Sequence, residues 1–101
     1  MIRHVVMWKL HEPADAVAFK ALLDGCRTLV PGIVEFDVGI RTEGFAAIAD
    51  VVLISTFTDA AALDAYQNHP HHKAVSAQVG PMRESRLMLD YPVLDLPAQG
   101  A

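Results

Sequence analysis

Positions 2–10 alternate along the chain in a way that an extended strand accommodates. Even positions are mostly apolar, and odd positions mix apolar with basic side chains. Successive side chains of a strand point to opposite faces of a sheet, so a period of two predicts a β-strand. Val6 and Trp8 stand on one face and Val5 and Met7 on the other. Both faces of the resulting sheet therefore need to be covered.

The remaining chain alternates between helical and strand patterns. We expect a helix over 14–30, strands over 33–40 and 49–57, helices over 60–68 and 71–79, and a strand over 84–91. Pro31-Gly32 ends the first helix, and Pro70 disfavours helical geometry at the residue before it. The order βαββαβ predicts an α+β, ferredoxin-like fold: a four-stranded antiparallel sheet with helices on one face.

Composition narrows the class of protein. The 101 residues predict one domain over 1–92 and a C-terminal tail over 93–101. The formal net charge of -4, without a basic run, argues against nucleic-acid binding. No apolar stretch approaches the roughly 20 residues needed to span a bilayer. With one cysteine, Cys26, an intrachain disulfide is impossible, and we expect a cytoplasmic protein.

Helices cover one side of such a sheet and leave the other side open. We expect that open side to expose Val6, Trp8 and their neighbours, which exceeds the apolar patch that a soluble monomer tolerates. Two copies packed sheet to sheet around a two-fold axis would cover it. The sequence therefore predicts a homodimer through the sheet faces, which Val6→Asp or Trp8→Asp would convert to monomer or aggregate.

The polar candidates for chemistry are few and lie close together. His4 is the only titratable residue on its face of the first strand, and Tyr66, His69, His71 and His72 follow one another later. His4 is either a satisfied core histidine or a polar group that orients a ligand in an apolar pocket. Tyr66 and His69, three residues apart, share a helix face. The alternative is that this segment has a purely structural role, in which a helix ends and the histidines are exposed to solvent.

Other chemistries find little support in the sequence. The histidines lack the spacing of a zinc site, and there is no phosphate-binding loop or Gly-x-Ser-x-Gly elbow. Cys26 lies on the apolar stripe of the first helix and fits a buried small hydrophobe. We therefore expect neither a metal nor an organic cofactor.

Two segments resemble a known family. The opening 2–10 is similar to the start of the stress-responsive dimeric α/β-barrel (Dabb) family, a ferredoxin-like group. Phe57, Asp59, Leu63, Tyr66, His69-Pro70 and His72 match its Phe…Asp…Leu-x-x-Tyr-x-x-His-Pro-x-His motif. The resemblance implies a protomer that dimerises through its sheet into a barrel.

The resemblance also implies roles for individual residues. In a plant polyketide cyclase of the family, the histidine matching His72 is the catalytic base and the tyrosine matching Tyr66 holds the substrate. The histidine matching His4 lines the same pocket. By extension, we expect a pocket for a small apolar ligand between helices and sheet, with these lining residues: His4, Val6, Trp8, Phe19, Leu53 and His69.

Two functions from different classes remain open. The first is a cofactor-free, polyketide-cyclase-like or isomerase/lyase-like enzyme acting on a small apolar carbonyl compound, with His72 as base and Tyr66 as hydrogen-bond donor. The second is a non-catalytic stress-responsive homodimer that binds small apolar molecules or acts structurally. The position of His72 relative to a cavity shared with Tyr66 and His4 discriminates between them.

Overall fold

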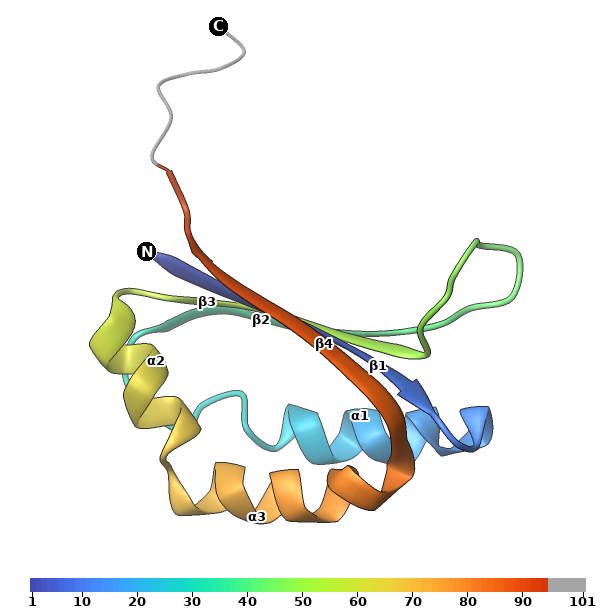
Figure 1. The fold of residues 1–101 in the computed structure, drawn as a ribbon. Helices are drawn as coiled ribbons and strands as arrows, with labels where there is room; N and C mark the ends of the chain where they lie inside the picture. Colours follow the sequence, from blue (N-terminus) through green and yellow to red (C-terminus); the bar gives the residue numbers. More distant parts are fainter. Residues whose placement is uncertain (95–101) are drawn as a thin grey trace, which may run out of the picture.

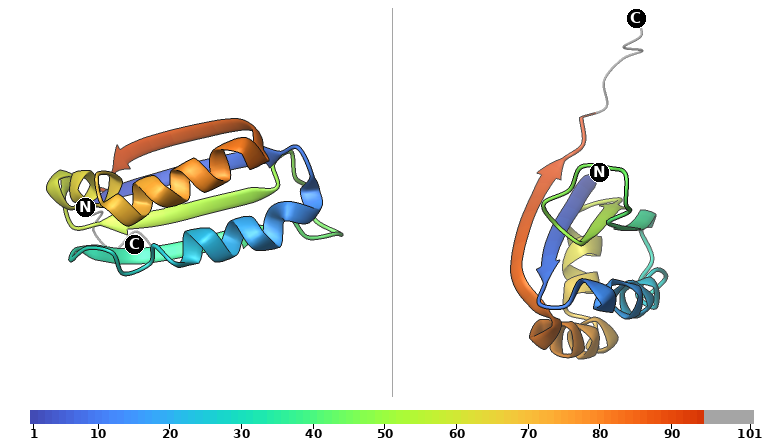
Figure 2. Two further views of the ribbon diagram at one scale, coloured as in Figure 1. Left: turned by 90° about the horizontal axis from the view of Figure 1, so that it is seen from below. Right: turned by 90° about the vertical axis from the view of Figure 1, so that its right-hand side faces the viewer.

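The computed structural model of the chain describes residues 1–94 (Figure 1). The elements follow in this order: β1 (Ile2–Leu10), the short 3-10 helix η1 (Pro13–Asp15), α1 (Ala16–Asp24), β2 (Ile33–Ile40), β3 (Val51–Phe57), α2 (Ala60–Gln67), α3 (Pro70–Val79), η2 (Gly80–Met82) and β4 (Arg83–Pro92). All of the helices cover the same face of one sheet, as Figures 1 and 2 show. The α+β, ferredoxin-like arrangement is the one expected.

The sheet has the strand order β2-β3-β1-β4, and the pairs are antiparallel. β1 therefore lies inside the sheet, between β3 and β4, while β4 forms one edge. Seen from the helix side in Figure 2, α3 runs along the β1 and β4 side and α1 runs beside β2. The first and last strands of the chain are thus neighbours, which brings His4 beside Asp90.

The first helix is shorter than expected. α1 ends at Asp24, and residues 25–32 form turns, with the amide of Cys26 donating to the carbonyl of Leu23. The apolar residues that suggested a longer helix still pack inward, since Cys26 is fully buried and Leu29 packs against the core. Gly25 lowers helix propensity at this point, and the turn buries the same side chains without helical geometry.

The face of β1 that carries Val6 and Trp8 is the reverse of what we expected. Both side chains are buried under the helices, 1% and 5% exposed, and Trp8 packs on Phe19 of α1 with ring centroids 5.0 Å apart. The expectation that they form the open face was wrong. Alternation separates two sets of side chains, but when both sets are apolar it does not indicate which set the helices cover.

The open face of the sheet carries the other set. Across its strands Val5 lies opposite Ile54 and Leu89, and Met7 lies opposite Val52 and Leu87. Leu87 and Leu89 are 70% and 63% exposed in the protomer. The open face of the sheet is therefore apolar, but residues other than Val6 and Trp8 form it.

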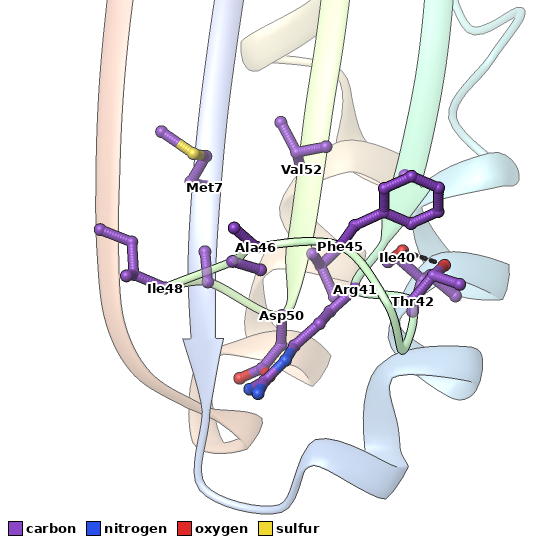
Figure 3. A pocket seen from close by; sticks show the side chains of 13 residues that line it. Met7, Ile40, Arg41, Thr42, Phe45, Ala46, Ile48, Asp50 and Val52 are labelled. Carbon is purple, nitrogen blue, oxygen red and sulfur yellow. Dashed lines mark hydrogen bonds and ion pairs between the residues drawn. The ribbon is translucent and has the colours of Figure 1, made fainter.

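The connection between β2 and β3, residues 41–50, bends over this open face. Its Phe45 and Ile48 are exposed, and Figure 3 shows them on the loop that faces the Met7 and Val52 side of the sheet. The loop is anchored by Asp50, whose carboxylate accepts from the amide of Leu10 at 2.8 Å. Loop and sheet line an open pocket of about 500 Å³.

The C-terminal tail expected over 93–101 falls largely outside the described residues. Val93 is described, and its amide donates to the carbonyl of Met1 at 2.9 Å, which extends the pairing of β4 with β1. Among residues 1–94, no helix has the length and apolar character needed to span a membrane.

Candidate functional site

His4 is held in place from two sides. It stands opposite Asp90 in the β1–β4 register and is 3% exposed, because its face of β1 lies under the helices. Its ring nitrogen Nδ1 contacts the carboxylate of Asp90. The hydroxyl of Ser55 on β3 donates to its backbone carbonyl at 3.2 Å. The Asp90 carboxylate accepts a hydrogen bond from Nδ1, and this contact orients the imidazole ring of His4.

A helix break places Tyr66 beside His72. α2 ends at Gln67, and His69 caps α3 by accepting the amide of His71 on its Nδ1 at 3.1 Å. Pro70 begins α3, a position at which its missing amide costs no hydrogen bond. The new helix direction brings the rings of Tyr66 and His72 to a centroid distance of 4.6 Å, edge to face.

Tyr66 and His72 share a cavity of about 190 Å³ between the sheet and the helices. These residues line it: His4, Val6 and Trp8 of β1, Leu23 of α1, Leu53 of β3, Tyr66 of α2, His72, Val75, Ser76 and Val79 of α3, and Arg83 and Arg86 of β4. Six residues that we expected at the site are thus together. His71 is exposed and does not line the cavity.

Two expected lining residues lie elsewhere. Phe19 is fully buried and packs against the ring of Trp8, outside the set of side chains that bound the cavity. His69 uses its ring to cap α3, so the motif histidine before Pro70 has a structural task. Neither side chain lies on the wall of this cavity, a placement that strand or helix periodicity does not determine.

The cavity also contains residues that sequence reasoning missed. Val75, Ser76 and Val79 lie three, four and seven positions after His72, so helical spacing from His72 would have found them. No comparable signal marks Arg83 and Arg86. They reach the cavity because Arg86 stands opposite Trp8 in the β1–β4 register, a pairing between residues far apart in the chain.

The hydroxyl of Tyr66 is the one buried side-chain polar atom in the described part of the chain that has no hydrogen-bond partner. Its ring packs against Phe57 and Phe36, with centroids 5.1 Å and 6.2 Å away. Burial raises the pKa of this phenol well above its usual value, so the hydroxyl stays protonated. It is a buried hydrogen-bond donor without an acceptor, on a residue that lines the cavity.

The pKa of His72 is shifted in the opposite direction from that of Tyr66. Burial lowers its pKa below the usual 6.5, and the nearby charge of His4 lowers it further. Arg86 and His69 act in the same direction, while backbone hydrogen bonding with Gln67 acts against them. At neutral pH the imidazole is therefore neutral and able to accept a proton.

This pKa predicts how stability depends on pH. Between the folded and unfolded pKa values of His72, the unfolded chain binds more protons than the folded one. The free energy of unfolding that this residue contributes is therefore complete above about 6.5 and falls as the pH drops toward the folded pKa. An NMR titration of the His72 ring should give a pKa below 6.5; a value at or above 6.5 contradicts the burial argument.

The larger pocket in Figure 3 has fewer side chains that could take part in proton transfer. Its titratable side chains are Arg41 and Asp50, which form an ion pair at 3.6 Å, and its remaining lining side chains are mostly apolar. Its lining contains no histidine. Within residues 1–94, no three His, Cys, Asp or Glu side chains gather as a metal site would require. The cavity with His72 is therefore the candidate site.

Comparison with known families agrees with this architecture. The model of the stress responsive A/B barrel domain, Dabb, matches residues 2–93. The chain belongs to the Dabb family. The match spans the whole fold, from the first residue of β1 to just past β4. Among curated proteins no match was found.

Solved structures resemble this Dabb chain over nearly their full length. A dimeric ferredoxin-like protein of unknown function from Jannaschia sp. CCS1 is 32% identical, with 91% of this chain and 98% of that one covered and a TM-score of 0.72. A Dabb family protein from Mesorhizobium loti is 26% identical, covering 92% and 96% at a TM-score of 0.70. A dimeric ferredoxin-like protein from Thermobifida fusca is 21% identical, covers 91% and 90%, and reaches 0.80.

Proposed function

We propose that this Dabb protein is a cofactor-free enzyme that removes a proton from a carbon next to a carbonyl group. The observation that carries the proposal is the pairing, in one cavity, of a histidine whose pKa is lowered with a buried tyrosine hydroxyl that lacks a partner. A neutral base and an unused donor are the two groups that enolisation requires.

Each group has a distinct part in the reaction. His72 accepts the proton from carbon, and Tyr66 donates a hydrogen bond to the oxygen on which negative charge develops. His4, Val6, Trp8 and Leu53 bind the remainder of the substrate. General base catalysis contributes about 10²–10⁴-fold, and the hydrogen bond to the enolate adds to it. The enolate then attacks a second carbonyl in an aldol-type cyclisation or takes a proton at another carbon in an isomerisation, as in polyketide-cyclase-like chemistry. Decarboxylation would reach the same kind of enolate by loss of CO₂.

The cavity limits the size of the substrate. An apolar cavity of about 150 Å³ holds benzene, so about 190 Å³ accommodates a body of roughly one six-membered ring. Val6, Trp8 and Leu53 supply its apolar wall. A compound with one ring or a short chain next to a ketone fits this description.

Proton exchange tests the proposal without knowledge of the natural product. Acetophenone and 3-oxo-3-phenylpropanoate each carry a ring and an acidic carbon next to a ketone. The protein should accelerate exchange of that carbon's hydrogen for deuterium in D₂O, followed by proton NMR against buffer alone. Failure to accelerate exchange of either probe, although the probe binds, overturns the enzyme proposal.

Tyr66→Phe should separate stability from activity. Removing a buried hydroxyl that has no partner removes its desolvation penalty, so the free energy of unfolding should rise by about 1 kcal/mol. For a domain of this size the midpoint of thermal unfolding then rises by about 4 °C or more. Exchange of acetophenone should fall several-fold because the enolate loses its donor. A variant that is less stable than the wild type contradicts the assignment of an unused donor.

We also propose that two copies associate through their open sheet faces. Val5, Met7, Leu87 and Leu89 leave an apolar surface on that face, and similar structures from Jannaschia and Thermobifida are described as dimeric. The pocket of Figure 3 opens on the same face, so a second copy would also cover Phe45 and Ile48. The single buried cysteine fits a reducing, cytoplasmic location for this dimer.

A non-catalytic binding protein is the second candidate. The apolar cavity wall and the unpartnered hydroxyl of Tyr66 suit a bound ligand whether or not a proton is transferred. The exchange assay distinguishes the two. Probes that bind equally well to the wild type and to His72→Ala, without exchange by either, favour binding alone.

A further inference from the structure

The cavity has a charged end that the proposed mechanism does not use. Arg83 and Arg86 of β4 both line it, next to His72 and Ser76 of α3. The chain is acidic overall, with 12 Asp and Glu against 8 Lys and Arg. Two arginines side by side at one cavity are therefore not a consequence of composition.

Neither arginine has an acidic partner in the described part of the chain. Of the six other Lys and Arg residues, five form ion pairs: Arg3, Lys9, Lys20, Arg27 and Arg41. The two carboxylates on the same strand contact other groups: Glu84 pairs with Lys9 at 3.5 Å, and Asp90 contacts His4. Both arginines are exposed and lie at the solvent side of the cavity, and neither is neutralised by an ion pair. Partial burial lowers the pKa of Arg86, the charge of Arg83 lowers it further, and Asp90 has a smaller opposing effect.

We propose that the cavity takes a small carboxylate, whose charge pairs with Arg83 and Arg86 and whose apolar body lies against Val6, Trp8 and Leu53. A guanidinium binds a carboxylate through two parallel hydrogen bonds, and the planar fork of arginine suits this group. The unpartnered hydroxyl of Tyr66 supplies a second polar contact at the same cavity. The bound carboxylate would supply the counter-charge for the two arginines and the hydrogen-bond acceptor for the Tyr66 hydroxyl.

This inference rests on the proposed function and names its substrate class. In a 3-oxo acid the acidic carbon lies between the carboxylate and the ketone. Pairing of the carboxylate with the arginines would hold that carbon inside the cavity that His72 lines. Neutral esters and thioesters of the same acid lack this anchor and should be poorer substrates.

Calorimetric titration of benzoate and its neutral analogue benzamide tests the anchor directly. The wild type should bind benzoate about 10- to 100-fold more tightly than benzamide, since hydrogen bonds to charged groups are each worth about 1.5–3 kcal/mol. The double variant Arg83→Gln/Arg86→Gln should lose this preference. Lys73→Gln, which removes one positive charge from an exposed side chain of α3 outside the cavity, should keep it.

Further arms separate the alternatives. Arg83→Lys/Arg86→Lys keeps both positive charges and should retain part of the preference for benzoate. This variant replaces the glutamine double variant if circular dichroism shows that the latter is unfolded. His72→Ala should still prefer benzoate, because the arginines and not His72 bind the carboxylate. A wild type that prefers benzoate but does not accelerate exchange of either ketone probe contradicts only the proposed function. A wild type that accelerates exchange of acetophenone but does not prefer benzoate over benzamide contradicts only the proposed carboxylate site.

Three results would overturn the carboxylate site. The first is equal affinity of the wild type for benzoate and benzamide, or no binding of benzoate at about 10 mM. The second is an arginine double variant that folds and binds benzoate as the wild type does. The third is tighter binding of phenylphosphonate than of benzoate, which would assign the arginines to a phosphate group.

Discussion

His72→Ala should lower the rate of α-proton exchange about 10²- to 10⁴-fold, the usual contribution of a positioned general base. The side chain is half-buried at the wall of a cavity, so its truncation enlarges existing space and leaves the packed core intact. The free energy of unfolding should therefore change by less than about 1 kcal/mol. Rates measured by proton NMR, together with thermal unfolding, check both statements.

His71→Ala is the matched control for this experiment. It removes the same side chain one position earlier on α3, where the ring is exposed and does not line the cavity. Its exchange rate should equal that of the wild type. The base is misassigned if His71→Ala is as slow as His72→Ala, or if His72→Ala keeps the full rate. In the active protein, the rate should rise with pH along one limb centred below 6.5.

Leu87→Asp should convert the dimer to monomer. Leu87 is 70% exposed in the protomer, so the substitution leaves the protomer core unchanged, but in the proposed dimer it buries a charge without a partner. Such a charge costs about 3–5 kcal/mol, which raises the dissociation constant roughly 10²–10⁴-fold. Sedimentation velocity at micromolar concentration measures the change.

Two further substitutions make this experiment specific. Val17→Asp places the same charge on an exposed position of α1, 72% exposed and away from the open face, and should leave the dimer intact. Val6→Asp should instead unfold the protomer, because Val6 is 1% exposed under the helices. A wild type that sediments as a monomer, or a Leu87→Asp protein that remains dimeric, excludes association through this face.

Much of the fold follows from local pattern. Alternation over 33–40 matches β2, and β-branched residues mark most of β3, because these segments carry strand periodicity without a competing helical one. Pro70 separates α2 from α3 where expected. The helix expected over 14–30 was too long because apolar spacing persists through the turns after Asp24.

The site was predicted only in part, and the reason is the same at each point. Local pattern, with a family motif, brought out His4, Tyr66 and His72, because their spacing and their place on a strand or helix are properties of short segments. Which face of β1 the helices cover depends on side chains from α1 and α3, so the burial of Val6 and Trp8 became visible only in three dimensions. The contacts of His4 with Asp90, and the approach of Arg86 to the cavity, follow from the pairing of the first strand with the last. Such a register is determined by packing across the whole sheet, and no short segment contains it.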